Sequence, residues 1–376
     1  MVKTCRTYSG WDINWKADFE RSIKALINGE DIPEAPITSS HMKDGRGNIA
    51  PATVILPTLA MEAKRKAEKD DANDYVVDYF MDILEKAIGD CKDELLERFD
   101  WICSQDPASA DFMYTNGTFF SYNDEFEKEG IRGVLKHGTL AIGQIGLAET
   151  LQILIGHDHT DPKGMALAKR IEELFQKKCK EYKENYKLNF GVYYTPAESL
   201  CLTSFNKFTK KYGLIENVNA YRDQNGKLVP RGYFTNSIHV PVWKEISPFE
   251  KIDIESQLTG YSIAGCITYV EIGDNAVNNL EALEQIVDYA MEKDVPYFAL
   301  NVLFSDCTQC GYSGYIKDDE DCPQCGANHE KYINDYARIT GYLSTKVSHF
   351  NQGKRMEKKD RYVHVNNLKN WIKAKA

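Results

Sequence analysis

Two Cys-x-x-Cys pairs constrain the fold of this chain more than any other feature of its sequence. Cys307–Cys310 and Cys322–Cys325 are separated by residues 311–321, and a glycine, Gly311 or Gly326, directly follows each pair. Four thiolates in this arrangement are typical of a tetrahedral zinc site, which is structural because no coordination position stays open for a substrate. The spacing predicts that zinc clamps this hairpin. Four free or redox-active thiols are the alternative.

The composition places the chain among globular proteins and limits its partners. It has 376 residues, of which 43% are hydrophobic and 27% charged, enough for a sizeable core in about two domains. The formal net charge of −10 disfavours direct nucleic-acid binding, including binding through a zinc ribbon, because a phosphate backbone requires a basic surface. Neither an apolar run of about 18 residues nor an apolar leader is visible, so we expect a cytoplasmic protein without a membrane-spanning helix.

Apolar periodicity alternates between strands and helices up to Phe304. In chain order, the predicted elements are a strand at 53–56, helices at 59–103, 141–154 and 165–189, strands at 190–194 and 261–272, a helix at 280–293 and a strand at 297–303. Strands separated by helices of this length predict an α/β fold with a largely parallel sheet. After Phe304 the apolar runs give way to the Cys- and Gly-rich segment.

A glycine sixteen residues beyond Cys325 lies in the motif Arg338-Ile339-Thr340-Gly341-Tyr342. Taken alone, Gly341 predicts a turn or a close-packing position. Following a four-cysteine site, however, the motif resembles the anaerobic (class III) ribonucleoside-triphosphate reductases, which are glycyl radical enzymes. The resemblance covers nearly the whole chain and includes Thr4–Thr7, Gly45–Asn48 through Leu56-Pro57, Tyr194–Glu198, Phe234–Ser237, Tyr297–Asn301, Phe350–Arg355 and Lys359–Arg361.

The resemblance implies that Gly341 stores the radical and that Cys5 carries the transient thiyl radical. An unpaired electron on a backbone α-carbon requires a residue without a side chain, flanked by amide and carbonyl groups that delocalise it. A cysteine S–H bond is weak enough to exchange hydrogen with that carbon and strong enough to drive abstraction from a ribose. Without the resemblance, Cys5 would be interpreted as a buried structural thiol. Asn48 is implied to bind the ribose hydroxyls, whereas by itself it indicates a turn residue.

The segment Thr195-Pro196-Ala197-Glu198 follows a predicted strand and has the pattern of a capping box, with Pro at the first helical position and Glu at the third. A helix N-terminus offers free N–H groups and a partial positive charge to a phosphate. Resemblance to the reductases' phosphate-binding loop favours a substrate-binding role for these four residues. An ordinary capped helix is the alternative.

By the same resemblance, residues 1–304 form the second half of a ten-stranded α/β barrel that bears the thiyl cysteine loop. Residues 305–376 form a domain with the zinc knuckle, the glycyl radical loop and a basic tail. The implied reaction reduces ribonucleoside triphosphates to deoxyribonucleoside triphosphates. A separate radical-SAM activating enzyme, which holds a 4Fe-4S cluster and S-adenosylmethionine, would generate the radical on Gly341. The complete enzyme is expected to be a homo-oligomer.

Members of the family are longer, with regulatory nucleotide sites and half of the barrel ahead of the radical cysteine. We therefore expect a split enzyme whose N-terminal half is a partner chain, because Cys5, Asn48, Gly341 and the four zinc thiolates are all present. A truncated chain and an inactive remnant are the alternatives. The remnant would bind partner proteins through its zinc knuckle and tail.

Two further interpretations concern the chemistry and the tail. A carbon–carbon lyase of the pyruvate formate-lyase type normally uses two adjacent cysteines, and Cys5 has no cysteine neighbour. The tail is expected to be a solvated helix, with a docking surface for a partner as the alternative. Its basic residues are Lys354, Arg355, Lys358, Lys359, Arg361, Lys369, Lys373 and Lys375.

Overall fold

A computed structural model describes most of the chain from Arg46 to Tyr362. The described residues are 10, 12–14, 27–29, 46–116, 118–119, 126, 129–272, 279–302, 304–314, 316, 320–339, 342–362 and 364. Cys5 and Gly341 lie outside them. None of the described helices is both long and apolar enough to cross a membrane.

A parallel sheet of three strands forms the centre of the molecule. Strands β1 (Asn48–Ile55), β2 (Thr139–Ile145) and β3 (Asn189–Tyr193) pair in the order β1-β2-β3. Every residue of β2 is buried, as expected for the middle strand of a sheet covered on both faces. A parallel bridge joins Tyr193 to Gly265, three residues before the next parallel strand begins.

The parallel pairing continues in the second half of the chain. Strand β6 (Thr268–Ile272) pairs in parallel with β7 (Phe298–Val302), and helix α11 (Leu280–Glu292) connects them. Together with the bridge at Gly265, these strands extend the parallel arrangement beyond β3. The predicted α/β class with a largely parallel sheet is therefore confirmed.

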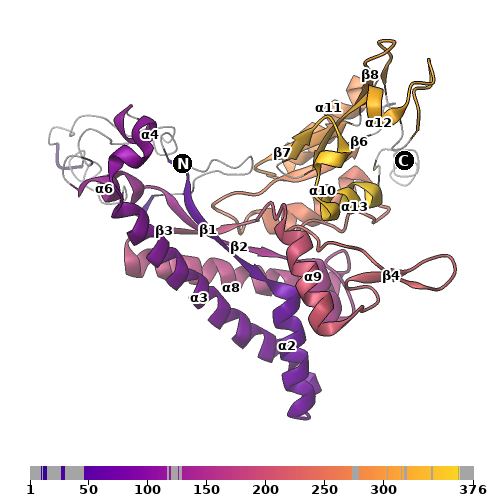
Figure 1. The fold of residues 1–376 in the computed structure, drawn as a ribbon. Coiled ribbons are helices and arrows are strands. Elements are labelled where there is room, and N and C mark those ends of the chain that lie inside the picture. Colours follow the sequence, from indigo (N-terminus) through magenta and orange to yellow (C-terminus); the bar gives the residue numbers. More distant parts are fainter. Residues whose placement is uncertain are drawn as a thin grey trace.

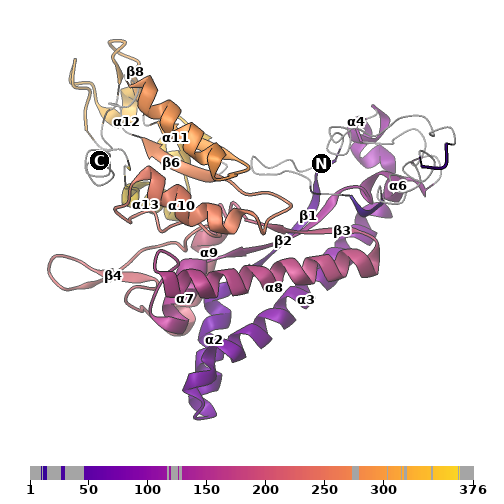
Figure 2. The same ribbon diagram turned by 180° about the vertical axis from the view of Figure 1, so that it is seen from behind.

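Long helices cover one face of the β1–β3 sheet (Figures 1 and 2). They are α3 (Val76–Cys103) and α8 (Pro162–Tyr186), whereas α2 (Leu56–Lys69) continues from the end of β1 and packs on α3 and α7 (Leu147–Ile155). Their apolar faces bury residues such as Phe80, Leu84 and Phe175 against the sheet. Short elements between them are η1 (Asn73–Tyr75), η2 (Pro107–Ala110), α4 (Asp111–Thr115) and α6 (Ile131–Leu135).

On the other side of the sheet, the C-terminal part forms an upper lobe in Figure 1. Strands β8 (Phe304–Cys307), β9 (Ser313–Gly314), β10 (Ile333–Ile339) and β11 (Tyr342–Ser344) form an antiparallel sheet in the order β11-β10-β8-β9. The remaining elements are α9 (Leu200–Tyr212), the hairpin of β4 (Ala220–Arg222) and β5 (Leu228–Pro230), α10 (Pro248–Thr259), α12 (His329–Tyr332), η4 (Val347–His349) and α13 (Gln352–Asp360).

The predicted helix at 141–154 is wrong in its first half. Residues 139–145 form the central strand β2, and the helix begins only at Leu147. A fully buried strand is apolar on both faces, so its pattern cannot be told from that of a buried helix. Gly146, with φ of +77°, separates the two elements. The predicted strand at 261–272 is likewise limited to 268–272.

Candidate functional site

Small residues line the face of the parallel sheet that points away from α3 and α8. Ala141 and Gly143 of β2 lie beside Gly191 and Tyr193 of β3, and Ala264 packs on this face. A Cβ atom on Gly143 would approach Thr195 Oγ1 to 2.0 Å and the Tyr193 carbonyl oxygen to 2.7 Å. The glycine is therefore required by close packing, and at Ala141 and Gly143 the middle strand carries no large side chain on this face.

Asn48 begins β1 on this same face, where it pairs with Thr139. Its side chain is 95% buried, and its Nδ2 donates to the carbonyl oxygen of Ala264 at 3.1 Å. Its Oδ1 has no hydrogen-bond partner among the described residues. A buried acceptor without a partner is unfavourable by itself, and a ligand hydroxyl would satisfy it.

A buried polar cluster that no sequence motif predicts holds residues 12–14 at the amino ends of the strands. Asp12 Oδ2 lies 2.7 Å from His137 Nδ1, and Asp12 Oδ1 accepts from Asn189 Nδ2 at 2.8 Å. Asn189 Oδ1 in turn accepts from the Ile13 amide. Burial would raise the pKa of Asp12, but its hydrogen bond to His137 and the charges of His137 and Arg46 lower it. The segment that begins seven residues after Cys5 is thus fixed to β2 and β3.

The capping box predicted at Thr195–Glu198 is wrong. Helix α9 begins at Leu200, and its N-cap, Ser199, makes no side-chain capping bond. Ala197 has φ of +47°, so the chain turns before it enters the helix. Thr195 Oγ1 instead lies 3.0 Å from Thr53 Oγ1, which joins the ends of β1 and β3. A true capping box occurs at Ser247 and Glu250, where α10 begins.

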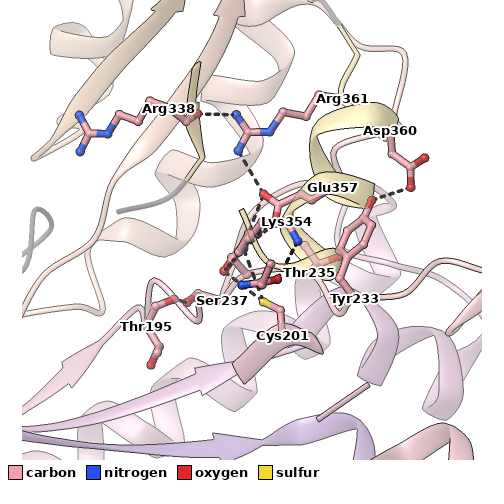
Figure 3. Close-up of polar contacts among 12 residues, drawn as sticks. Thr195, Cys201, Tyr233, Thr235, Ser237, Arg338, Lys354, Glu357, Asp360 and Arg361 are labelled. Carbon is pink, nitrogen blue, oxygen red and sulfur yellow. Dashed lines mark hydrogen bonds and ion pairs between the residues drawn. The ribbon is translucent and has the colours of Figure 1, made fainter. Parts of the chain in front are cut away.

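A second loop, residues 234–237, supports the 195–198 segment (Figure 3). Ser237 Oγ donates to the Thr195 carbonyl at 2.8 Å. The Asn236 side-chain amide is oriented so that both its nitrogen and its oxygen form hydrogen bonds. In this orientation the nitrogen donates to the Pro196 carbonyl at 2.7 Å. Thr235 is bound through its amide and hydroxyl to Glu149 Oε1. The carboxyl end of β3 is therefore built from two interlocked loops.

The expectation of a solvated tail helix is wrong for two of its basic residues. The Lys354 side chain is fully buried, and its Nζ pairs with Glu357 Oε2 at 2.5 Å. Arg361 is 8% exposed and pairs with Glu357 and Glu271. Burial alone would raise the pKa of Glu357, but Lys354 and Arg361 lower it to about 2. Arg355 and Lys359 are exposed, as expected. Lys369, Lys373 and Lys375 lie outside the described residues.

The four paired cysteines meet in one cluster, with all four sulfur atoms within 4.8 Å of one another. Cys307 Sγ lies 3.8 Å from Cys325 Sγ, and Cys310 Sγ lies 3.7 Å from Cys322 Sγ. A tetrahedron with Zn–S bonds of about 2.3 Å has sulfur–sulfur edges of about 3.8 Å, so the donor set fits this metal. The Gly311 and Gly326 amides donate to the Cys307 and Cys322 carbonyls, which makes two matching turns. The cluster could therefore hold a metal such as zinc.

A family model described as anaerobic ribonucleoside-triphosphate reductase matches residues 2–364. The chain belongs to this family. Anaerobic ribonucleoside-triphosphate reductases of Escherichia coli (strain K12) and Enterobacteria phage T4 are 29% and 28% identical to it over 339 and 359 residues. These matches cover 86% and 90% of this chain but only 43% and 54% of the relatives. The chain thus spans about half the length of the curated relatives it matches, or less.

Solved structures share the fold of this reductase family member. An anaerobic ribonucleotide reductase superposes with a TM-score of 0.58 and 21% identity, over 85% of this chain and 45% of the other. The Thermotoga maritima anaerobic ribonucleotide reductase in complex with dATP and CTP gives a TM-score of 0.57 and 21% identity. That alignment covers 84% of this chain and 45% of the Thermotoga chain.

Proposed function

We propose that this chain carries the radical chemistry of an anaerobic ribonucleoside-triphosphate reductase and works together with the remaining part of the barrel. The observation that carries the proposal is the family match, which extends over residues 2–364. The oxidoreductase class follows from the family. The substrate class is supported further by the Thermotoga structure, which binds dATP and CTP.

In the proposed reaction, Gly341 stores the radical and Cys5 takes it up as a thiyl. Cys5 removes the 3′-hydrogen of a ribonucleoside triphosphate, the 2′-hydroxyl leaves as water after protonation, and an external reductant supplies the two electrons that, with a second proton, form the new C2′–H bond. Return of the 3′-hydrogen from Cys5 restores the thiyl radical, which retrieves its hydrogen from Gly341. The environment of Asn48 supports its role as the ribose ligand, because its buried Oδ1 has no partner among the described residues and could accept a hydrogen bond from a hydroxyl group.

The 195–198 segment is the proposed phosphate-binding loop. The position of this segment supports a phosphate-binding role. It follows the carboxyl end of β3, and ligands bind at the carboxyl ends of the strands in parallel α/β sheets. The 234–237 loop fixes two of its carbonyls, at Thr195 and Pro196. The amides of 197–199 precede α9, whose first turn offers further donors.

The proposal divides the chain after residue 304. Residues 1–304 contribute strands of a ten-stranded barrel, and residues 305–376 carry the zinc knuckle, the glycyl radical loop and the tail. Zinc held by Cys307, Cys310, Cys322 and Cys325 would be structural, since four thiolates leave no position open. A radical-SAM enzyme with a 4Fe-4S cluster is the proposed activating partner, and a homo-oligomer the proposed assembly.

Electron paramagnetic resonance under strict anaerobiosis tests the proposal. The chain is combined with the N-terminal half of a reductase, an activating enzyme and S-adenosylmethionine. We expect an oxygen-sensitive doublet and the formation of deoxyribonucleotides, and both should be lost in Gly341→Ala. Deoxyribonucleotide formation by Gly341→Ala would contradict the radical assignment. A doublet without any product would instead favour a radical-bearing remnant.

A further inference from the structure

The strand that leads to Gly341 is held by side chains outside its own sheet. Among the described residues, strand β10 pairs with β8 from Ile333 to Tyr336. Two residues later, the carbonyl oxygen of Arg338 accepts two hydrogen bonds, from Arg361 Nη1 and from Asn301 Nδ2, both at 3.1 Å. Both donors come from outside the sheet to which β10 belongs.

The Arg361 guanidinium is itself fixed in place. Nη2 donates to Glu357 Oε1 at 3.1 Å, and Nη1 also pairs with Glu271 Oε1. Asn301 Nδ2 contacts the other oxygen of Glu271, so both donors to Arg338 share this carboxylate. Arg361 and both carboxylates are at least nine-tenths buried. A buried, multiply bonded arginine adopts one geometry, which suits it to locate a backbone atom.

The first turn of the preceding helix, α13, contacts the opposite side of the site (Figure 3). Lys354 Nζ bonds to Glu357 Oε2 and, in the satisfied orientation of Asn236, to the Asn236 side-chain oxygen at 3.1 Å. Asn236 then reaches the Pro196 carbonyl. An unbroken series of hydrogen bonds thus runs from Pro196 through Asn236, Lys354, Glu357 and Arg361 to Arg338.

We infer that Arg361 is a positioning residue. It fixes β10 at Arg338, which is three residues before Gly341, relative to the 195–198 segment. The inference rests on the proposed function, in which β10 leads to the radical glycine and the 195–198 segment binds the substrate, so that the distance between them affects catalysis. Hydrogen transfer requires near-contact of the reacting atoms, and a misplacement of about 1 Å costs about 100-fold in rate.

The test compares Arg361→Gln with Arg355→Gln, which changes an exposed arginine on the same helix. Amide hydrogen exchange is followed anaerobically in the full chain, with zinc content as a control for folding. In Arg361→Gln we expect the amides of residues 337–344 to exchange about tenfold faster or more. Exchange in β1–β3 and the zinc content should match the wild type, and Arg355→Gln should match it throughout. Unchanged exchange at 337–344 would overturn the inference.

Kinetics with the N-terminal half and activating enzyme present give the second readout. In Arg361→Gln, kcat per glycyl radical should fall about 100-fold, whereas KM for the ribonucleoside triphosphate stays within about twofold because Lys354 and Asn236 are intact. Equal losses in both parameters would contradict a positioning role. Absence of product with the wild-type chain would contradict the proposed function, while the exchange comparison would still decide the inference.

A second variant keeps the test valid should Arg361→Gln not fold. Asn301→Ala removes one of the two donors to the Arg338 carbonyl and leaves the Arg361 ion pairs in place. We expect this variant to accelerate amide exchange at 337–344 by about threefold relative to the wild type. Where Arg361→Gln also folds, the acceleration in Asn301→Ala should be the smaller of the two. Exchange identical to the wild type in Asn301→Ala would count against a fixed Arg338 carbonyl.

Discussion

Asn48 shows at the scale of one residue how a buried amide can be prepared for a ligand. The nitrogen end of the side chain stabilises the fold, because Nδ2 donates to the carbonyl oxygen of Ala264. The other end, Oδ1, is buried and without a partner among the described residues. The residue type alone predicts only a turn, and the resemblance alone implied the site. The structure adds the free acceptor, on the face lined by small residues.

Replacing Asn48 with Ala should therefore impair catalysis more than folding. Loss of the Ala264 hydrogen bond should destabilise the chain by about 1 kcal/mol. Loss of the acceptor for a substrate hydroxyl should lower kcat/KM by about 10- to 100-fold, which corresponds to about 1–3 kcal/mol. Steady-state kinetics of the assembled enzyme measure the effect, with exposed Asn225→Ala as the matched control. Wild-type kcat/KM in Asn48→Ala would show that Oδ1 is not a substrate ligand.

A second buried polar group, Glu172 on α8, makes stability depend on pH. Its Oε1 accepts from Gln144 Nε2 of β2 at 2.8 Å. Burial raises its pKa from the ordinary 4.5 to about 8, even though hydrogen bonds from Tyr194 and Gln144 act in the opposite direction. The folded chain thus retains a proton that the unfolded chain releases. This contribution is complete below about pH 4.5 and is lost as the pH rises through about 8.

Thermal unfolding at a series of pH values tests this prediction. Between pH 5 and 8, the melting temperature of the wild type should fall more than that of Glu172→Gln, which stays neutral and isosteric. At pH 8 the variant should be the more stable of the two. Glu184→Gln, on the exposed face of the same helix, should keep the wild-type slope. Parallel curves for Glu172→Gln and the wild type would mean that Glu172 ionises normally in the fold.

At the scale of the elements, the sequence predicted types better than boundaries. Helices α8 and α11 and strands β3 and β7 were predicted close to their observed ranges, because the two helices have a clear period and the two strands are short apolar runs. Strand β2 was missed, because burial on both faces removes its alternation. The capping box predicted at 195–198 was wrong for another reason. The Thr195 hydroxyl forms a hydrogen bond with Thr53 of β1 instead of capping the helix that follows.

For the four-cysteine segment, the local sequence was sufficient to predict that the four thiols meet. Two glycines in the left-handed region, Gly311 and Gly326, turn the chain after each cysteine pair. By contrast, the interaction of α13 with β10 joins residues 23 apart in the chain, and no periodicity marks it. Short-range motifs can be identified by spacing, whereas contacts between elements depend on a fold that the spacing does not specify.

Removal of one ligand should abolish metal binding at the knuckle. We expect one zinc per wild-type chain and a strongly reduced content in Cys310→Ser, because three thiolates no longer complete the tetrahedron. Hydrogen exchange should accelerate in β8, β9 and the start of β10, which surround the cluster. Metal analysis of the purified chain provides the measurement, and Cys91→Ser, on helix α3, is the control. Full zinc occupancy in Cys310→Ser would exclude the four-thiolate site.

The whole molecule presents a parallel sheet with an open side. In the described part of the chain, β1 pairs with β2 on one edge and with no strand on the other. Pro51 is exposed in β1, a position that proline tolerates in edge strands. Edge strands with free N–H and C=O groups can accept a further strand. The proposed barrel would use this edge for closure.

Mixing this chain with the N-terminal half of a reductase should yield a defined complex. Sedimentation should show one species of the summed mass or a multiple of it, and amide exchange in β1 should slow. The β4–β5 hairpin, which projects from the body in Figures 1 and 2, should exchange as before. Complex formation without protection of β1 would place the partner elsewhere and contradict closure at this edge.

The position of Arg361 in the chain also sets an order of events during synthesis. A ribosome makes β10 before α13, and the Arg338 carbonyl receives its arginine donor only after 23 more residues have been added. Until then, the strand can pair within its own hairpin but cannot be located against the loops after β3. A nascent chain therefore completes the parallel strands and the two cysteine turns first, and the alignment of β10 against the loops after β3 follows them.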